Sequence, residues 1–185
     1  MKQLINFLTY SRIVLTPIIM YLIFSNYYTI AALLFMYCSF SDVADGRLAR
    51  KHNLVSEKGN YLDPLADKVL MIGTLSILLF QGLIHFWAYA IIIGRDILIT
   101  VYRNYLISKN RPLVTSQYGK WKTVSQHVAV IFCLIAFPDI STPNILYQFS
   151  NGLQLYYQET LNLIFGLNAI YAAGTGIHYV AKNGL

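Results

Sequence analysis

Residues 42–67 read DVADGRLARKHNLVSEKGNYLDPLAD, and half of the chain's eight acidic residues are the aspartates of this stretch, Asp42, Asp45, Asp63 and Asp67. Apolar sequence adjoins the stretch on both sides. No charged residue occurs at positions 29–41, and none occurs at positions 69–94. The stretch therefore connects two apolar segments, and its acids lie at the adjoining ends of those segments.

The spacing of the aspartates brings their carboxylates together in pairs if both segments are helices. Asp42 and Asp45 are three residues apart, so they share one helix face, and Asp63 and Asp67 are four apart and do the same. The short connection places the two pairs opposite each other. A carboxylate within a bilayer costs about 2.5–3.5 kcal/mol on insertion scales. Because four carboxylates would also repel one another, divalent cations are expected to neutralise them.

The chemistry of this cluster indicates which metal it binds. Its donors are carboxylate oxygens without His or Cys, which suits Mg²⁺, Mn²⁺ or Ca²⁺ rather than Zn²⁺. Four carboxylates exceed what one Mg²⁺ takes from a protein, so two ions about 3.5–4 Å apart that bridge a phosphoryl substrate fit better. The alternative is a set of ion pairs that hold the helices together, with the partners Arg47, Arg50, Lys58 and Lys68.

The composition of the whole chain is that of a membrane protein. Hydrophobic residues make up 56% and charged residues 12% of its 185 residues, whereas soluble domains contain about 25% charged residues. So little charge cannot coat a water-soluble protein, and two cysteines exclude a disulfide scaffold. A membrane-spanning helix needs about 20 apolar residues. We expect an all-α integral membrane protein with six transmembrane helices at about Leu8–Tyr27, Thr29–His52, Asn60–Gln81, Ile84–Ser108, Tyr118–Phe137 and Glu159–Ala181.

The positions of the cations predict the orientation of these segments. All 14 Lys and Arg residues can be placed at one face of the membrane, and the stretch Pro138–Gln158, expected as a loop with room for a short interfacial helix, has none. Because positive charge stays on the cytoplasmic side, both termini are expected to be cytoplasmic. The net charge of +6 then reflects topology rather than nucleic-acid binding. No repeat or soluble domain is visible, so residues 1–185 are expected to form one domain.

The full spacing of the central stretch is Asp42-x2-Asp45-Gly46-x2-Ala49-Arg50-x8-Gly59-x3-Asp63-x3-Asp67. This pattern resembles the signature of the CDP-alcohol phosphotransferase family. Eight specified positions would match by chance with a probability on the order of 10⁻¹⁰ per start position. The resemblance implies that a substituted phosphoryl group is transferred from a CDP-linked donor to an alcohol, with release of CMP.

The resemblance also implies roles for individual residues of the signature. Asp42, Asp45 and Asp63 correspond to ligands of two divalent cations, Mg²⁺ or Mn²⁺. Asp67 lies near these ions as a further ligand and resembles the catalytic base that takes the proton from the acceptor hydroxyl. The residues that correspond to the binding site of the CDP-linked donor are Asp45, Gly46, Ala49, Arg50 and Gly59.

Further segments resemble the bacterial phosphatidylglycerophosphate synthase branch of this family. They are residues 6–17 (NFLTYSRIVLTP), residues 61–70 (YLDPLADKVL), and the sequences around residues 94–96, 103 and 119–126. The likeness implies that the donor is CDP-diacylglycerol and that the acceptor is sn-glycerol 3-phosphate. It also implies a homodimer in the bacterial cytoplasmic membrane, with the active site facing the cytoplasm.

The expected acceptor needs a basic pocket of its own. Glycerol 3-phosphate is a dianion, so cations beyond those that face the donor must bind its phosphate. The residues of the fourth and fifth segments that can supply them are Arg95, Arg103, Lys120 and Lys122. Lys120 and Lys122 can instead be markers of the cytoplasmic side, and Asp96 can pair with Arg95 or with Lys68.

Other functions fit part of the sequence. A cardiolipin synthase or a phosphatidylinositol-phosphate synthase would share the family signature, although phosphatidylglycerol as an acceptor needs a second lipid groove. A cation transporter also uses acids within the membrane, but it predicts acids near the bilayer midplane and an internal repeat. The acids here cluster toward one face and no repeat is seen, so the phosphatidyltransferase is favoured.

Overall fold

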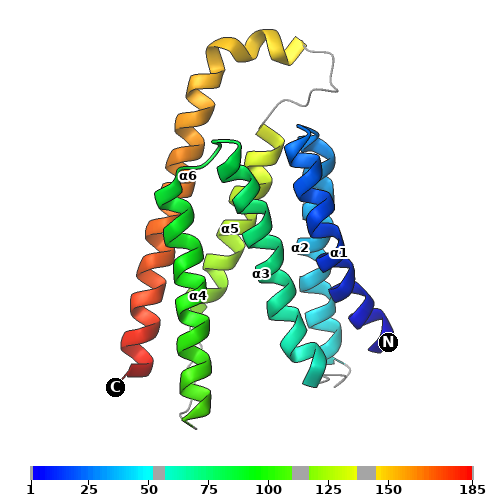
Figure 1. Ribbon diagram of the computed structural model, residues 1–185, viewed down its shortest axis with the longest axis vertical. Coiled ribbons are helices and arrows are strands. Elements are labelled where there is room, and N and C mark those ends of the chain that lie inside the picture. The colour runs from blue at the N-terminus through cyan, green and yellow to red at the C-terminus, as the bar shows by residue number, and fades with distance from the viewer. Residues whose placement is uncertain (1, 52–56, 110–116, 137–144, 185) are drawn as a thin grey trace. The chain divides into compact units, whose positions relative to one another are not determined.

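The computed structural model describes residues 2–51, 57–109, 117–136 and 145–184, with side chains described at 10–41, 65–109, 117–136 and 157–183. Within these ranges the chain forms helices and no strand (Figure 1). The helices are α1 (Lys2–Phe24), α2 (Tyr28–Lys51), α3 (Glu57–Phe80), α4 (Phe86–Ser108), α5 (Gln117–Ala136) and α6 (Ile145–Gly184). The expectation of an all-helical chain is thus confirmed for the described residues.

Helix α6 begins earlier than expected. Each of α1 to α5 overlaps one of the expected segments, but α6 begins at Ile145, 14 residues before Glu159. The sequence left room for a short helix within Pro138–Gln158, and the structure has a helix there from Ile145 onward, but this helix is continuous with the sixth segment. Polar Gln, Asn and Ser residues interrupt the apolar run there and weaken the hydropathy signal. No proline follows Pro143, however, so nothing in the backbone prevents a continuous helix.

The helices fall into two compact units. Unit 1 comprises Met1–Gln81 and Val130–Asn151, and unit 2 comprises Gly82–Ala129 and Gly152–Leu185. The acidic signature at residues 42–67 belongs to unit 1, whereas the cations expected at the acceptor site belong to unit 2. The expectation of one domain over residues 1–185 is not tested by this division and stays a prediction.

In unit 1, helix α1 packs against both α2 and α3. Gly73 of α3 lies against Thr16 and Met20 of α1, and the rings of Phe24 and Phe80 lie 6.2 Å apart at the C-terminal ends of the two helices. Helices α1 and α3 therefore run parallel. Fully buried apolar side chains fill the space between the helices, among them Ile19, Ile23, Ala31, Phe35, Leu75 and Leu78.

A polar network fixes the turn between α1 and α2. Asn26 ends α1 with a φ of 61°, in the left-handed region that Asn tolerates better than most residues. Its Oδ1 accepts a hydrogen bond of 2.8 Å from the hydroxyl of Tyr28. Gln81 Nε2 donates to the carbonyl oxygen of Ile23 at 2.7 Å. Because Gln81 directly follows α3, these bonds tie the end of α3 to the turn.

In unit 2, helices α4 and α6 run parallel and in contact. Gly166 of α6 leaves room for the ring of Trp87, which a Cβ at this glycine would meet at 3.1 Å. Further along both helices, the rings of Tyr102 and Tyr179 lie 6.4 Å apart, edge to face. A glycine in contact with a large aromatic ring allows the two helix axes to approach closely.

Helix α5 runs antiparallel to α6 within unit 2. Ser125 Oγ donates to Asn168 Oδ1 at 2.8 Å, and near the start of α5 the ring of Tyr118 lies 5.3 Å from that of His178. Later residues of α5 therefore contact earlier residues of α6. These contacts position the side chains of the first turns of α5 beside the last turns of α6.

Large apolar side chains cover much of the described surface. Phe40, Phe80, Phe86 and Ile177 are each at least 70% exposed. Among the described residues, one helical stretch, Tyr157–Asn183, is long and apolar enough to cross a membrane, and two shorter apolar stretches are Tyr10–Phe24 and Tyr28–Ser41. One such stretch does not establish the expected six spans, which stay a prediction.

Replacing Gly73 by alanine is expected to destabilise unit 1. The new Cβ would lie 2.9 Å from both Met20 Sδ and Thr16 Cγ2, so α1 and α3 would have to move apart. Overpacking of this kind costs about 1–3 kcal/mol, and the thermal unfolding midpoint of the detergent-solubilised protein should fall. Gly119→Ala is the control, because nothing lies within 4 Å of its added Cβ. An unchanged midpoint for Gly73→Ala would contradict the tight contact.

Candidate functional site

The acidic residues of the signature lie on the two helices of unit 1 that the sequence predicted for them. Asp42 and Asp45 belong to α2, and Asp63 and Asp67 belong to α3. The side chain of Asp67 is half-buried and makes a polar or electrostatic interaction. The remaining signature side chains lie outside the described ones, and these are Asp42, Asp45, Gly46, Ala49, Arg50, Gly59 and Asp63.

The described side chains alone do not form a metal site. No group of three or more His, Cys, Asp or Glu comes together among them. Since Asp67 is the one signature carboxylate whose side chain is described, this finding leaves the four-carboxylate ligand set untested. The ligand set therefore stays a prediction, and the structure supplies the helical placement of its members.

A buried cation lies on the helix that packs against these acid-bearing helices. Arg12 of α1 is fully buried. Its own carbonyl oxygen accepts a 2.8 Å hydrogen bond from Thr16 Oγ1. The sequence analysis gave this arginine no role. An enclosed guanidinium in unit 1 places positive charge in the same unit as the four aspartates.

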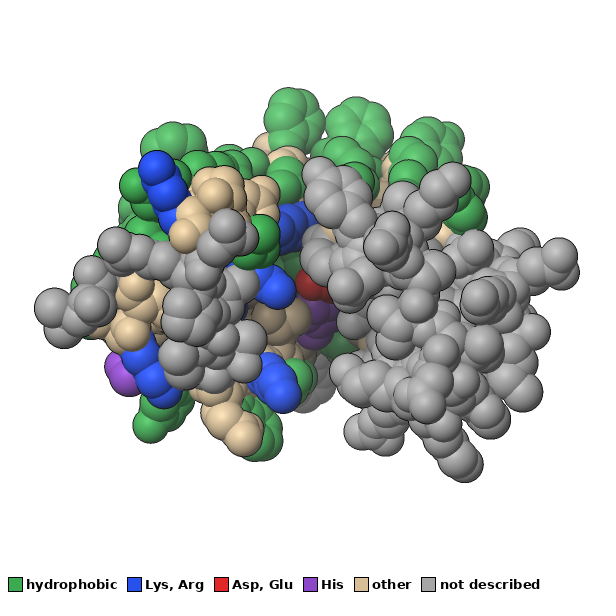
Figure 2. All heavy atoms as spheres, turned by 90° about the horizontal axis from the view of Figure 1, so that it is seen from below, with side chains coloured by type: hydrophobic (Ala, Val, Ile, Leu, Met, Phe, Trp, Pro, Cys, Tyr) green, Lys and Arg blue, Asp and Glu red, His purple; other side chains and the backbone are tan. Residues whose placement is uncertain are grey.

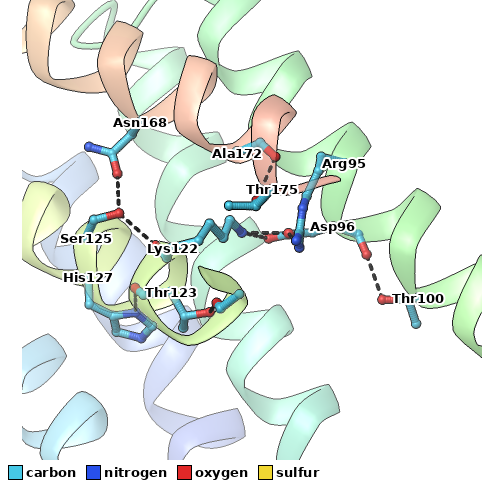
Figure 3. A network of polar contacts seen from close by, with 11 residues as sticks. Arg95, Asp96, Thr100, Lys122, Thr123, Ser125, His127, Asn168, Ala172 and Thr175 are labelled. Carbon is cyan, nitrogen blue, oxygen red and sulfur yellow. Dashed lines mark hydrogen bonds and ion pairs between the residues drawn. The ribbon is translucent and has the colours of Figure 1, made fainter. Parts of the chain in front are cut away.

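In unit 2, one carboxylate holds two cations. Lys122 Nζ of α5 lies 2.6 Å from Asp96 Oδ1 and 2.5 Å from Asp96 Oδ2 of α4. Arg95 Nη1 lies 3.1 Å from the same Oδ1. Figure 3 shows the three side chains, hereafter the Asp96 cluster, meeting between α4 and α5. The pairing of Asp96 with Arg95 that the sequence analysis considered is confirmed, and Lys122 is a further partner.

Burial makes these contacts strong. The Lys122 side chain is 3% exposed, and those of Arg95 and Asp96 are 15% and 22% exposed. An ammonium enclosed in this way must be neutralised, and two oxygens of one carboxylate do so. Two cations on one acid leave the cluster with a formal charge of +1. The cluster is therefore electrically suited to a further anion.

Helix α6 is shaped to accept the arginine of the cluster. A Cβ added at Gly176 would lie 3.0 Å from Arg95 Cγ and 3.6 Å from its Nε, so a larger residue would displace the side chain. Thr175, the neighbouring residue, is 6% exposed and donates to the carbonyl oxygen of Ala172 (Figure 3). On α4, Thr100 Oγ1 donates to the backbone oxygen of Asp96 at 2.6 Å.

The four cations expected at the acceptor site do not all come together. Arg95 and Lys122 meet at Asp96, whereas Arg103 and Lys120 are exposed, and no ion pair is found between either of them and a described residue. Figure 2 views the molecule from below and shows exposed Lys and Arg side chains among the hydrophobic side chains of the described surface. The expected set therefore divides into a buried pair and an exposed pair.

Comparison with protein families assigns most of the chain to one of them. Residues 2–164 match the family described as CDP-alcohol phosphatidyltransferase, and this match includes the whole of residues 42–67. The chain belongs to the CDP-alcohol phosphatidyltransferase family. The resemblance inferred from the spacing of the aspartates is confirmed.

Relatives in this family carry two different names. The CDP-diacylglycerol–glycerol-3-phosphate 3-phosphatidyltransferase of Bacillus subtilis is 34% identical over 161 residues, which cover 75% of this chain and 83% of that protein. The protein of the same name in Mycoplasma pneumoniae is 38% identical over 108 residues, 58% of this chain and 48% of that protein. A "Cardiolipin synthase (CMP-forming) / mitochondrial hydrolase fusion protein" of Schizosaccharomyces pombe is 41% identical over 107 residues.

The matched region covers different shares of these phosphatidyltransferase relatives. It spans 18% of the Schizosaccharomyces pombe fusion protein and about half of the Mycoplasma pneumoniae protein, at 48%. It spans most of the Bacillus subtilis protein. These matches establish the family of this chain, whereas its reaction must be inferred from its own residues.

The sequence analysis missed part of the Asp96 cluster. Asp96 and Lys122 are 26 residues apart, so their pairing depends on the register of α4 against α5 rather than on local spacing. Two features of the sequence nevertheless single out residues of this region. Lys122 and Gln126 are four residues apart and share a helix face, and Asp96 is the sole acidic residue between Lys68 and Asp139.

Two of the three charges of the Asp96 cluster, those of Asp96 and Lys122, should differ in their effect on stability. Asp96→Leu removes the carboxylate that both cations share and should cost about 3–5 kcal/mol. Lys122→Met leaves the Arg95–Asp96 pair intact and should cost less. Thermal unfolding of both variants in the same detergent measures the difference. Equal destabilisation by the two substitutions would show that Asp96 does not neutralise both cations.

Proposed function

We propose that the chain is a phosphatidylglycerophosphate synthase, a CDP-diacylglycerol–glycerol-3-phosphate 3-phosphatidyltransferase. The observation that carries this proposal is the complete signature from Asp42 to Asp67 inside the region that matches the family. The relatives of that name in Bacillus subtilis and Mycoplasma pneumoniae support the choice of substrates. The enzyme transfers the phosphatidyl group to sn-glycerol 3-phosphate and releases CMP.

The acidic residues of α2 and α3 fit two divalent cations, Mg²⁺ or Mn²⁺. None of the specified positions of the signature is His or Cys, and the donors are carboxylates, which is the ligand chemistry of these ions. The residues that would hold them are Asp42, Asp45, Asp63 and Asp67. When bound, the ions would offset the negative charge that develops on the CMP leaving group. The donor nucleotide would bind beside them at Asp45, Gly46, Ala49, Arg50 and Gly59.

Asp67 is the proposed catalytic base. Its carboxylate takes the proton from a primary hydroxyl of glycerol 3-phosphate, and the hydroxyl oxygen attacks the phosphorus of the phosphatidyl group. The bond from that phosphorus to the CMP oxygen breaks, and CMP leaves with the electron pair. A base in this role must lie within hydrogen-bond reach of the attacking oxygen. The half-buried position of the Asp67 side chain in α3 is compatible with this role.

The phosphate of the acceptor is proposed to bind the cations of unit 2. Arg95 and Lys122 form a buried cluster with a formal excess of one positive charge. Arg103 and Lys120 are exposed and can guide the dianion toward that cluster. Arg can also bind phosphate with two parallel hydrogen bonds, whereas Lys acts as a point charge.

The membrane arrangement follows from the same proposal. The donor is a lipid, and the exposed apolar side chains of the described helices are suited to contact lipid chains. We therefore propose six transmembrane helices in a bacterial cytoplasmic membrane, with both termini and the active site on the cytoplasmic side. A homodimer is part of the proposal because the resemblance implies it.

A cardiolipin synthase is the second candidate. The Schizosaccharomyces pombe fusion protein with that activity in its name is 41% identical over 107 residues, a higher identity than the Bacillus subtilis relative shows. Its acceptor would be phosphatidylglycerol, a lipid. The buried cationic cluster of unit 2 favours a phosphate-bearing soluble acceptor instead. The two candidates differ in the acceptor, so an acceptor competition separates them.

An assay of the purified protein tests the reaction. With CDP-diacylglycerol, Mg²⁺ or Mn²⁺ and glycerol 3-phosphate, CMP release is expected, and a chelator should abolish it. Asp67→Asn should lower the rate by at least about 100-fold because the base is lost. Glu159→Gln, an exposed acid outside the signature, should retain the rate. CMP release only with phosphatidylglycerol or with inositol phosphate would overturn the choice of acceptor.

The exposed pair of cations gives a separate prediction about acceptor binding. Arg103→Ala and Lys120→Ala should each raise the KM for glycerol 3-phosphate about two- to fivefold, the modest effect of exposed charges. The KM for CDP-diacylglycerol should not change. Lys109→Ala is a matched control, because Lys109 is an exposed lysine at the end of α4 that lies over the ring of Tyr105. An unchanged acceptor KM in both test variants would remove Arg103 and Lys120 from the acceptor site.

A further inference from the structure

Two hydrogen-bond donors, one within the Asp96 cluster and one a helical turn from Lys122, have no partner in the described part of the chain. Arg95 Nε and Gln126 Nε2 are both enclosed, and neither has a hydrogen-bond partner among the described residues. Gln126 is 3% exposed and lies one helical turn from Lys122 on the same face of α5. An enclosed donor without a partner costs about 1–3 kcal/mol, so native proteins leave few of them. Donors next to paired cations indicate a negatively charged ligand with several acceptor oxygens.

Among the described acids of unit 2, Asp96 alone lies within reach of both cations of the cluster. Residues 82–129 and 152–185 contain seven Lys or Arg but only two acids, Asp96 and Glu159. Glu159 is exposed and adjoins Gln158, whose Nε2 donates to the carbonyl oxygen of Gly82. Asp96 lies 14 residues beyond Gly82, most of them in α4, which rises about 1.5 Å per residue. Glu159 is therefore too distant to neutralise Lys122 in place of Asp96.

We propose that Asp96 is a positioning residue of the acceptor-phosphate subsite and that Gln126 completes this subsite with Arg95 and Lys122. The inference rests on the function proposed above. Asp96 does not itself contact the phosphate, because two anions would repel each other. It holds the Lys122 ammonium and the Arg95 guanidinium in place, and this leaves Arg95 Nε and Gln126 Nε2 to donate to phosphate oxygens.

The charge of the cluster also sets the class of acceptor. Two cations and one carboxylate leave a single formal positive charge, which would offset part of the charge of a phosphate monoester dianion. A neutral alcohol such as glycerol would leave the two enclosed donors, Arg95 Nε and Gln126 Nε2, without a partner. The subsite therefore selects an alcohol that carries a phosphate group. A purely structural ion pair would show no such selection.

Substitutions at Asp96 separate a positioning role from a structural one. Asp96→Asn keeps the shape but loses the charge that holds the two cations, and the KM for glycerol 3-phosphate should rise about tenfold or more. The KM for CDP-diacylglycerol should remain within about twofold of that of the unmodified enzyme. Asp96→Glu restores the carboxylate and should bring the acceptor KM back to within about threefold. A purely structural pair would change stability without this division between the two KM values.

A second variant leaves the charges untouched. Gln126→Leu replaces the enclosed amide by an apolar side chain of similar size, so it should fold even if Asp96→Asn does not. It should raise the acceptor KM about tenfold and leave the donor KM unchanged. The control is Glu159→Gln, which alters the other acid of unit 2 at an exposed position and should change neither KM.

The outcomes distinguish this inference from the proposed function. If the unmodified enzyme releases no CMP with glycerol 3-phosphate, the proposed function fails, and the inference that depends on it fails too. If the unmodified enzyme is active and Gln126→Leu keeps its acceptor KM, the subsite is wrong while the function stands. If Asp96→Asn folds and also keeps its acceptor KM, Asp96 is a structural residue. Equal increases in the acceptor and donor KM values would likewise overturn the assignment.

Discussion

A charge enclosed by apolar helices must have a partner of opposite charge, and this constraint accounts for most of what is distinctive in this chain. The desolvation of a lone carboxylate or ammonium costs several kcal/mol, which is a large part of the stability of a domain. The charged groups are therefore few and are gathered into clusters. In the described structure the Asp96 cluster satisfies this constraint within the protein. The four aspartates of α2 and α3 are proposed to satisfy it with metal ions.

The two kinds of cluster occur in different parts of the chain. Unit 1 carries the signature aspartates, which bind positive ions in the proposed function, and unit 2 carries an excess of cations over acids. A reaction between a metal-bound diphosphate and a phosphate-bearing alcohol needs both kinds of charge. In the proposed function, unit 1 supplies the acids for the donor nucleotide and unit 2 supplies the cations for the acceptor.

The sequence predicts the elements of this structure better than their contacts. Six helical segments were predicted from apolar runs, and the aspartate spacing identified the family, because both signals are local. The continuation of α6 back to Ile145 was not predicted, because polar residues interrupt the apolar run there although the backbone permits a helix. The pairing of Lys122 with Asp96, and the space that Gly176 gives to Arg95, arise from the register between helices. Neither can be deduced from residue spacing alone.

The contrast between Lys120 and Lys122 affects the chemical reactivity of this face of the protein. The Lys120 amine is exposed, whereas the Lys122 ammonium is enclosed and held by both oxygens of Asp96. An acylating reagent needs an accessible, unprotonated amine, so it would modify Lys120 and spare its neighbour two residues away. Covalent labelling of the surface lysines would thus remove the outer positive charge while the buried cationic cluster keeps its own.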